Sequence, residues 1–202
     1  MKKGISILIF TLFSCVIYAQ KTSIGIRLSN NVTGLPVSTY PALFYSNFHP
    51  GIDLSLKHRI NESEKHQWSL SGNVGLFYHR FIQTGIKIYP SLDYALAFNS
   101  KWKLNASLDL GYLLAFNNVA VLELQEGGDY EARTSLKARS QFMVGWRIGA
   151  SYTPSGKGDG TCYSLAFGTF LQGPYVSGYV PLLPYNSFTV GMERPLNLKK
   201  QK

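Results

Sequence analysis

The chain has 202 residues with 14% aromatic and only 15% charged side chains, and its formal net charge is +9. This length suits one domain with a core or one closed barrel, and the charged fraction lies well below the roughly 25% of typical soluble domains. No basic face with interleaved aromatic residues occurs, which argues against a nucleic-acid partner, whereas anionic lipid head groups or simple solubility are both compatible with the excess of basic residues.

Residues 1–19 have the build of a cleaved secretory signal peptide. Two lysines near the start precede a mostly apolar run, and the small residue Ala19 ends the segment. Without those lysines the net charge is +7. A lipoprotein leader is the alternative, because the residues before Cys15 loosely resemble a lipobox. We therefore predict an exported protein, with its folded domain over residues 20–196 and a basic tail over residues 197–202.

The rest of the chain predicts neither a disulfide framework nor a membrane-spanning helix. Cys162 is the only cysteine after the leader, and a lone cysteine cannot form an intrachain disulfide. No window approaches the roughly 18 consecutive apolar residues of a transmembrane helix. The dominant pattern is an alternation of apolar with small or polar residues, clearest over residues 67–116.

This alternation predicts β-strands, because successive side chains of a strand point to opposite faces. No segment shows a convincing helical period. Eight strands are expected, over residues 23–29, 51–59, 67–79, 86–98, 102–116, 138–152, 162–172 and 187–194.

The connections between these strands alternate in length, with one exception. Connections two, four and six are short turns, at residues 60–65, 99–101 and 154–160. Long loops are expected at residues 30–50 (with a strand extension near Leu43–Tyr45), 117–137 and 173–185, whereas the third connection, near Phe81–Gly85, is short. Short turns on one side and longer loops on the other are typical of a transmembrane up-and-down barrel. An even strand number then places both termini on the short-turn side, which would be the periplasm.

Side-chain size predicts which face of the strands points outward. An eight-stranded barrel has an interior just wide enough for side chains to fill. The apolar set is bulky, with Trp, Tyr, Phe and Leu on nearly every strand, whereas the opposite set is rich in Gly, Ala and Ser. The apolar face is therefore expected to face lipid, although a secreted lipocalin-like barrel with the opposite facing is the soluble alternative. We expect an engineered charge at Leu92 or Leu108 to disfavour folding in lipid.

The inward set also carries charges of both signs, which would have to pair in a closed lumen. We expect a lumen plugged by polar and charged side chains, with no open channel. The charged residues of this set are Arg27, Asp53, Lys57, Arg59, Lys87, Asp93, Lys103, Asp109, Arg147 and Glu193.

Aromatic residues recur where strands end beside the short turns, as in the interfacial belts of membrane proteins. These residues are Trp68, Phe98, Trp102, Tyr152 and Tyr163, and a second belt could comprise Tyr78, Tyr112, Phe142 and Phe188.

Residues 20–196 resemble the small eight-stranded outer-membrane β-barrel proteins of Gram-negative bacteria. The resemblance rests on the leader, the number of strands, the alternation of apolar residues, the asymmetry of the loops and the aromatic belts. The resemblance implies an all-β fold, an eight-stranded antiparallel up-and-down transmembrane barrel, and a monomer in the outer membrane. One feature departs from the family: many members end in an aromatic residue that serves as an assembly signal, whereas this chain ends MERPLNLKKQK.

Four histidines are candidates for chemistry. His58 and His66 flank one short turn, but a metal site would need further ligands, and Glu62 and Glu64 are only loosely placed. His79 is expected inside the barrel at the outer end of its strand. Some barrels of the resembled family modify lipid A with a His, a Ser and a carboxylate, but no His-x-Ser spacing occurs here. No residue is therefore assigned to a catalytic, cofactor-binding or metal site, and no cofactor is expected.

Function is expected in the loops. The stretch 173–185 is apolar and aromatic although the topology places it outside the cell, and exposed apolar loops bind a partner or fold back. We expect outer-membrane lipid as one partner and possible protein contacts at loops 117–137 and 173–185. The sequence thus favours a structural or surface-interaction role over its alternatives, a lipid A-modifying enzyme and a narrow pore.

Overall fold

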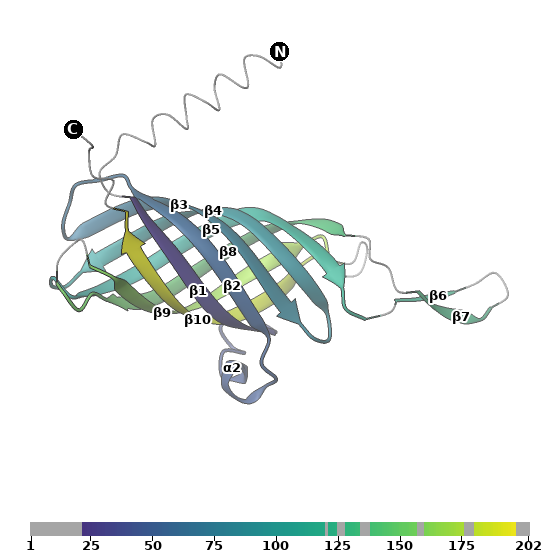
Figure 1. Ribbon diagram of the computed structural model, residues 1–202. Helices are drawn as coiled ribbons and strands as arrows, with labels where there is room; N and C mark the ends of the chain where they lie inside the picture. The colour runs from purple at the N-terminus through teal and green to yellow at the C-terminus, as the bar shows by residue number, and fades with distance from the viewer. Residues whose placement is uncertain are drawn as a thin grey trace, which may run out of the picture.

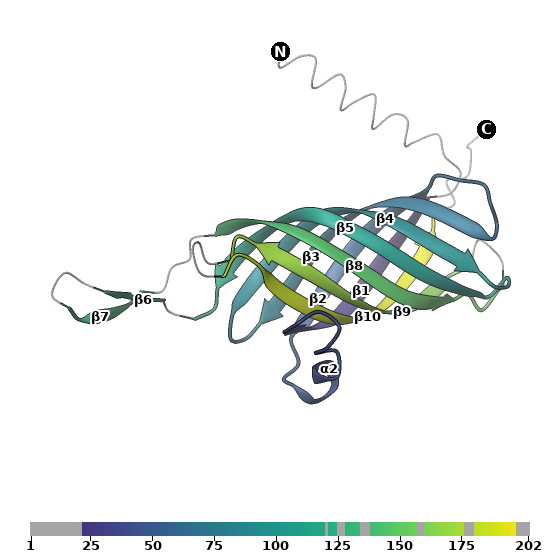
Figure 2. The same cartoon turned by 180° about the vertical axis from the view of Figure 1, so that it is seen from behind.

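The computed structural model describes residues 22–119, 121–124, 128–133, 138–156, 160–175 and 180–196. Within them, eight long antiparallel strands close into a barrel (Figures 1 and 2). Around the barrel the strands follow one another in chain order, and the last pairs with the first. The predicted all-β, up-and-down barrel is confirmed, whereas the predicted leader and basic tail lie outside the described residues.

The barrel strands agree with the predicted ranges to within a few residues at each end. They are β1 (Thr22–Thr33), β2 (Pro50–Arg59), β3 (His66–His79), β4 (Gln83–Ala97), β5 (Trp102–Asn117), β8 (Arg139–Tyr152), β9 (Cys162–Gly173) and β10 (Leu183–Pro195). The remaining elements are a helical turn α2 (Ala42–Tyr45) and a separate hairpin of β6 (Val121–Leu124) and β7 (Tyr130–Arg133).

The two ends of the barrel differ. We call the end where β1 starts and β10 finishes the terminal end, and the other the far end. Short turns join β2 to β3, β4 to β5 and β8 to β9 at the terminal end. At the far end, the β6–β7 hairpin projects well beyond the barrel (Figure 1). The β3–β4 connection there is a tight turn over residues 80–82, as its shortness in the sequence indicated.

The apolar face of the alternation points outward. Leu28, Leu54 and Leu108 are 59%, 55% and 64% exposed, whereas inward Ser71, Asn73 and Ser91 are almost fully buried. A lumen this narrow accepts the small side chains and leaves the bulky ones outside. The outer surface therefore carries an apolar belt of the kind that lipid covers.

Strand register places the aromatic residues of the terminal end at common levels. Trp102 pairs with Tyr152, which in turn pairs with Tyr163, so three neighbouring strands carry rings side by side. Trp68 likewise pairs with Tyr94, with ring centroids 4.8 Å apart. These rows have the geometry expected of an interfacial aromatic belt.

One local prediction was wrong. Leu43–Tyr45 form the helical turn α2 instead of a strand extension, with the Ser46 N–H donating to Ala42 O at 2.9 Å. Three consecutive apolar residues do not alternate, and burial of Leu43 against the barrel favours the turn. In both views α2 lies outside the barrel wall, near β1 and β10 (Figures 1 and 2). No helix in the described part of the chain is long and apolar enough to cross a membrane.

A charge placed on the apolar belt tests the outward facing of that surface. We expect Leu108→Arg to lower the free energy of unfolding in lipid vesicles by about 2–4 kcal/mol, as arginine does near the midplane of barrel walls. Urea titration of the refolded protein measures the loss. Asp129→Arg, which adds an arginine at an exposed position beyond the barrel, is the control and should leave stability unchanged; equal stability of both variants would contradict a lipid-facing belt.

Candidate functional site

The middle of the lumen holds a charged network centred on Asp53. Lys87 Nζ lies 3.1 Å from Asp53 Oδ1, and the Tyr89 hydroxyl donates to the same oxygen at 2.9 Å. Arg27 and Arg147 each donate to the Tyr89 hydroxyl oxygen, at 3.2 and 3.4 Å. The network joins β1, β2, β4 and β8, so it ties together strands that are not all neighbours. It confirms the predicted pairing for Asp53 and Lys87, two residues of the inward set.

A second part of the network lies on β4, β5 and β8. Arg147 Nη2 is 2.9 Å from Asp109 Oδ1 and 3.9 Å from Asp93 Oδ1. Asp93 also accepts hydrogen bonds from the hydroxyls of Ser71 and Ser107. These donors satisfy carboxylates that lie away from bulk water, which limits the cost of burying them.

Towards the far end the lumen is filled by apolar side chains, which the sequence prediction of a polar and charged plug did not include. The plug comprises Phe77, Tyr89, Leu113, Met143, Phe170 and Tyr185. Phe77, Leu113 and Tyr185 have no exposed surface, so their side chains are packed tightly within the lumen. The alternation in the sequence could have indicated the plug, because these six residues fall on inward positions of their strands.

Glycines opposite the plug rings make the plug possible. A Cβ at Gly85 would lie 2.2 Å from Cε1 of Phe77, and a Cβ at Gly111 would lie 2.3 Å from Cβ of Tyr89. Both approaches are far closer than side chains tolerate. Gly85 and Gly111 therefore leave the room that the neighbouring aromatic side chains of the plug occupy.

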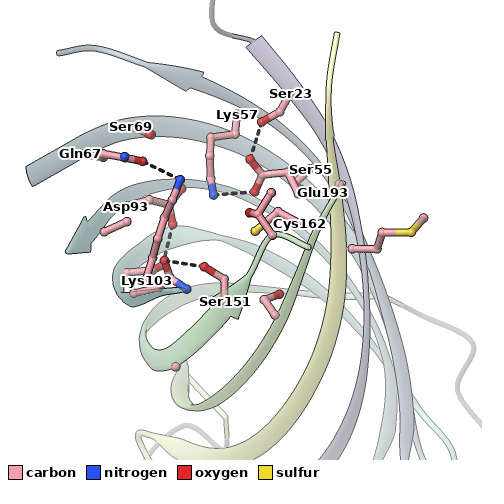
Figure 3. A pocket seen from close by; sticks show the side chains of 18 of the residues that line it. Ser23, Ser55, Lys57, Gln67, Ser69, Asp93, Lys103, Ser151, Cys162 and Glu193 are labelled. Atoms are coloured by element: carbon pink, nitrogen blue, oxygen red, sulfur yellow. Dashed lines mark hydrogen bonds and ion pairs between the residues drawn. The ribbon is translucent and has the colours of Figure 1, made fainter. Parts of the chain in front are cut away.

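Between the charged network and the terminal end of the barrel lies a cavity of about 440 Å³, lined mostly by polar residues (Figure 3). We call this cavity the vestibule. Lys57 and Glu193 form an ion pair of 2.7 Å across it, and Ser23 donates to the same carboxylate. Lys103 reaches across the vestibule to donate to the side-chain oxygen of Gln67 at 3.0 Å (Figure 3).

The vestibule carries an excess of positive charge. Its lining includes five basic residues, Arg27, Lys57, Arg59, Lys103 and Arg147, against the two acids Asp93 and Glu193. Among the described residues, Arg59 and Lys103 bond only to uncharged oxygens, those of Ser63 and Gln67. The described lining of the cavity therefore has a net positive charge. Its lining contains no histidine, so no His–Ser pair is available there for nucleophilic catalysis.

His79 lies in the lumen at the far end, as parity predicted, but its surroundings differ from a catalytic arrangement. Its ring stacks on that of His49 with centroids 3.7 Å apart, and the Tyr185 ring is 5.8 Å away. His79 Nδ1 is buried without a hydrogen-bond partner, and neither a serine nor a carboxylate engages the ring in the described structure. The geometry is that of aromatic packing.

The His49 side chain accepts a bond from the Arg80 backbone N–H and is only 4% exposed. Burial lowers the pKa of His49 below its ordinary value of 6.5. Protonation would also place a charge against the stacked ring of His79. The neutral form of this histidine pair is therefore the form that fits the fold.

The other two histidines have separate partners. His58 Nδ1 lies 3.3 Å from the Thr22 hydroxyl, and His66 Nδ1 lies 2.7 Å from the Tyr94 hydroxyl. Across the described residues, no group of three or more His, Cys, Asp or Glu side chains is arranged to hold a metal ion. Neither histidine therefore forms part of a ligand set with Glu62 or Glu64.

The described part of loop 173–185 folds back onto the barrel mouth. Arg139 donates to Tyr175 O at 3.0 Å and lies over the Tyr175 ring, and Gln141 donates to Pro174 O at 2.8 Å. Tyr185, at the start of β10, belongs to the plug. Of the two outcomes that the sequence left open for this loop, folding back is the one that these contacts show.

Loop 117–137 contains the β6–β7 hairpin, which stands clear of the barrel (Figures 1 and 2). The hairpin pairs Val121 with Arg133 through Leu124 with Tyr130. In sequence this stretch is acidic: Glu123, Glu126, Asp129 and Glu131 are four of the chain's eleven acidic residues.

Solved structures with similar chain paths include several outer-membrane proteins. The chain aligns with the outer membrane enzyme PagL (9% identity, 86% of this chain and 99% of that chain, TM-score 0.47) and with Neisserial surface protein A (12%, 87% and 97%, 0.49). It also aligns with Ail, the attachment invasion locus protein of Yersinia pestis (12%, 88% and 99%, 0.44). No protein-family model and no curated protein sequence matches the chain. At these identities the likeness is one of fold, and it assigns no activity.

The Asp53–Lys87 pair provides a test of the lumen network. We expect Asp53→Asn to cost about 3–5 kcal/mol of stability, because it leaves a buried lysine without its carboxylate. The double variant Asp53→Asn with Lys87→Met should recover part of that loss, giving a favourable coupling in a double-mutant cycle measured by urea unfolding. Lys101→Met, at an exposed turn lysine, is the control; additive single-variant effects would show that the pair is not coupled.

The buried histidine pair predicts a pH dependence of stability. Because the pKa of His49 is lowered in the fold, the unfolded chain binds the proton more readily, so the free energy of unfolding should fall as pH drops below about 6.5. Unfolding measured between about pH 7.5 and 5.5 checks this, since carboxylates stay ionised there. His49→Gln should flatten the profile and His66→Gln should not; an unchanged slope in His49→Gln would refute the assignment.

Proposed function

We propose that the protein is an outer-membrane barrel of a Gram-negative bacterium whose role is surface interaction through the β6–β7 hairpin. The observation that carries the proposal is the projection of this hairpin beyond a barrel whose lumen is filled by the plug (Figure 1). A filled lumen does not conduct solutes, whereas a hairpin held away from the barrel mouth is accessible to a partner.

Membrane residence rests on the outer surface. Large apolar side chains occupy the outward positions of all eight strands, and a soluble barrel would expose that surface to water. The soluble lipocalin-like alternative requires the opposite facing. With both termini at the periplasmic end, the far end and its hairpin lie outside the cell.

The composition of the hairpin indicates the kind of partner. Its acidic residues stand out on a chain that is otherwise basic. Complementary charge steers association and fixes orientation. A partner with a basic surface therefore fits the hairpin best.

Neither rival function gains support from the structure. A pore would need an opening where Phe77, Leu113 and Tyr185 are fully buried. A lipid A-modifying enzyme of the kind considered above would need a serine and a carboxylate beside His79, whose ring contacts in the described structure are His49 and Tyr185.

Binding to a poly-lysine surface tests the role of the hairpin. The wild-type protein in zwitterionic nanodiscs should be retained, although its net charge is positive, because four acidic residues are concentrated within residues 123–131. A variant with Glu123, Glu126 and Glu131 changed to Gln and Asp129 to Asn should lose most of the retention, and added salt should weaken the wild type. Both proteins should show the same heat-modifiable gel migration. Equal retention of the two would overturn the proposed role.

Three further measurements separate the rivals. Release from membranes by carbonate alone would exclude an integral barrel. Modification of lipid A by the purified protein would establish the enzyme instead, and single-channel conductance well above background in planar bilayers would establish the pore.

A further inference from the structure

The segment 34–48, which we call the strap, lies over the outer wall of the barrel, whereas the next residue, His49, stacks on His79 in the lumen. Hydrogen bonds fasten the strap to outward-facing polar residues of β1 and β10. The Asn186 side chain donates to Leu35 O at 3.0 Å and to the Thr39 hydroxyl, and the Asn30 side chain donates to Leu43 O at 2.8 Å. Asn186 has no exposed surface although it points away from the lumen.

Ring contacts place the strap alongside the apolar belt. Tyr40 lies 5.4 Å from Phe167 and 6.3 Å from Trp146 between ring centroids, and its hydroxyl is 3.2 Å from that of Thr169. Phe167 pairs with Phe188 near the middle of β9 and β10. The strap therefore lies beside the middle part of β9 and β10, where the neighbouring outward side chains are apolar.

The polarity of the strap is partly inverted relative to a loop in water. The Thr39 and Tyr40 hydroxyls and the carbonyl oxygens of Leu35 and Leu43 bond to the wall, whereas Ser38, Ser46 and Asn47 are exposed. The large side chains of Leu35, Phe44, Tyr45 and Phe48 are 70%, 68%, 79% and 69% exposed. Residues 34–48 contain no Asp, Glu, Lys or Arg. A solvated loop would expose the polar groups and bury the rings.

We propose that the strap is a membrane-inserted segment, whose exposed side chains bind the acyl chains and head-group boundary of the leaflet around the far end. Lipid is the partner that matches this surface, because the exposed apolar side chains of the strap adjoin the apolar belt of the barrel. The strap has no charged side chain with which to bind a polar partner. The strap also covers Asn30, Thr169 and Asn186, polar residues that would otherwise face lipid. The proposal rests on membrane residence of the barrel, as inferred above.

Site-directed fluorescence distinguishes lipid contact from exposure to water. Single cysteines at Phe44 on the strap, Leu108 on the belt and Asp129 beyond the barrel are introduced in a Cys162→Ser background and labelled with an NBD dye. Each protein is refolded into phosphatidylcholine vesicles with or without doxyl-labelled lipid. Tyr45→Cys is a second strap site in case the Phe44 variant fails to fold, and heat-modifiable migration checks every variant.

We expect the strap label to be quenched several-fold more than the label at residue 129, with a blue-shifted emission. Doxyl groups near the lipid head should quench it better than deep ones, and the reverse is expected at residue 108. Quenching at residue 108 with none on the strap would overturn the strap proposal and leave the barrel in the membrane. No quenching at residue 108 would overturn membrane residence itself. Loss of strap quenching on self-association of the labelled protein would assign the strap to a second copy, which also overturns lipid contact.

Discussion

The lumen of an eight-stranded barrel is too narrow for water to solvate the charges that point into it, and the structure depends on how those charges are neutralised. Asp53 receives Lys87 and the Tyr89 hydroxyl, and that hydroxyl oxygen in turn accepts bonds from Arg27 and Arg147. A single oxygen thus connects strands on different sides of the barrel. Removing one member would leave a buried charge unpaired, which costs more than the pair contributes.

This network divides the lumen into two parts with different chemistry. On the far side, Lys87 lies over the rings of Phe77 and Phe170, at 5.8 and 5.3 Å from their centroids, so the ion network passes directly into the apolar plug. On the terminal side, the vestibule is wide enough for water, and among the described residues of its lining basic side chains outnumber acidic ones. The plug lies between the vestibule and the far end of the barrel.

The outer wall follows a simpler rule. Apolar side chains cover most of it, and other outward polar residues, such as His58, Thr84 and Arg194, lie near strand ends. Where Asn30, Thr169 and Asn186 point outward, the strap supplies hydrogen bonds and its own apolar cover. The wall and the strap thus act as one surface. All three polar residues lie under the strap, so the strap covers the place where polar residues interrupt the outward apolar positions.

The sequence by itself determined the class of fold, since a period of two fixes which side chains share a face, and the size of those side chains fixes which face fits a narrow lumen. It placed His79 and the charged residues inside for the same reason. It did not determine which charges pair, because Asp53 and Lys87 meet only when β2, β3 and β4 are in register, with Gly75 between them. The plug residues carried the right parity but became a cluster only through register. From the sequence, the strap could be interpreted only as part of a long loop. Its position against β9 and β10 depends on residues more than 120 positions away in the chain; Thr169, for example, is 129 positions from Tyr40. Only the tertiary structure brings these residues together.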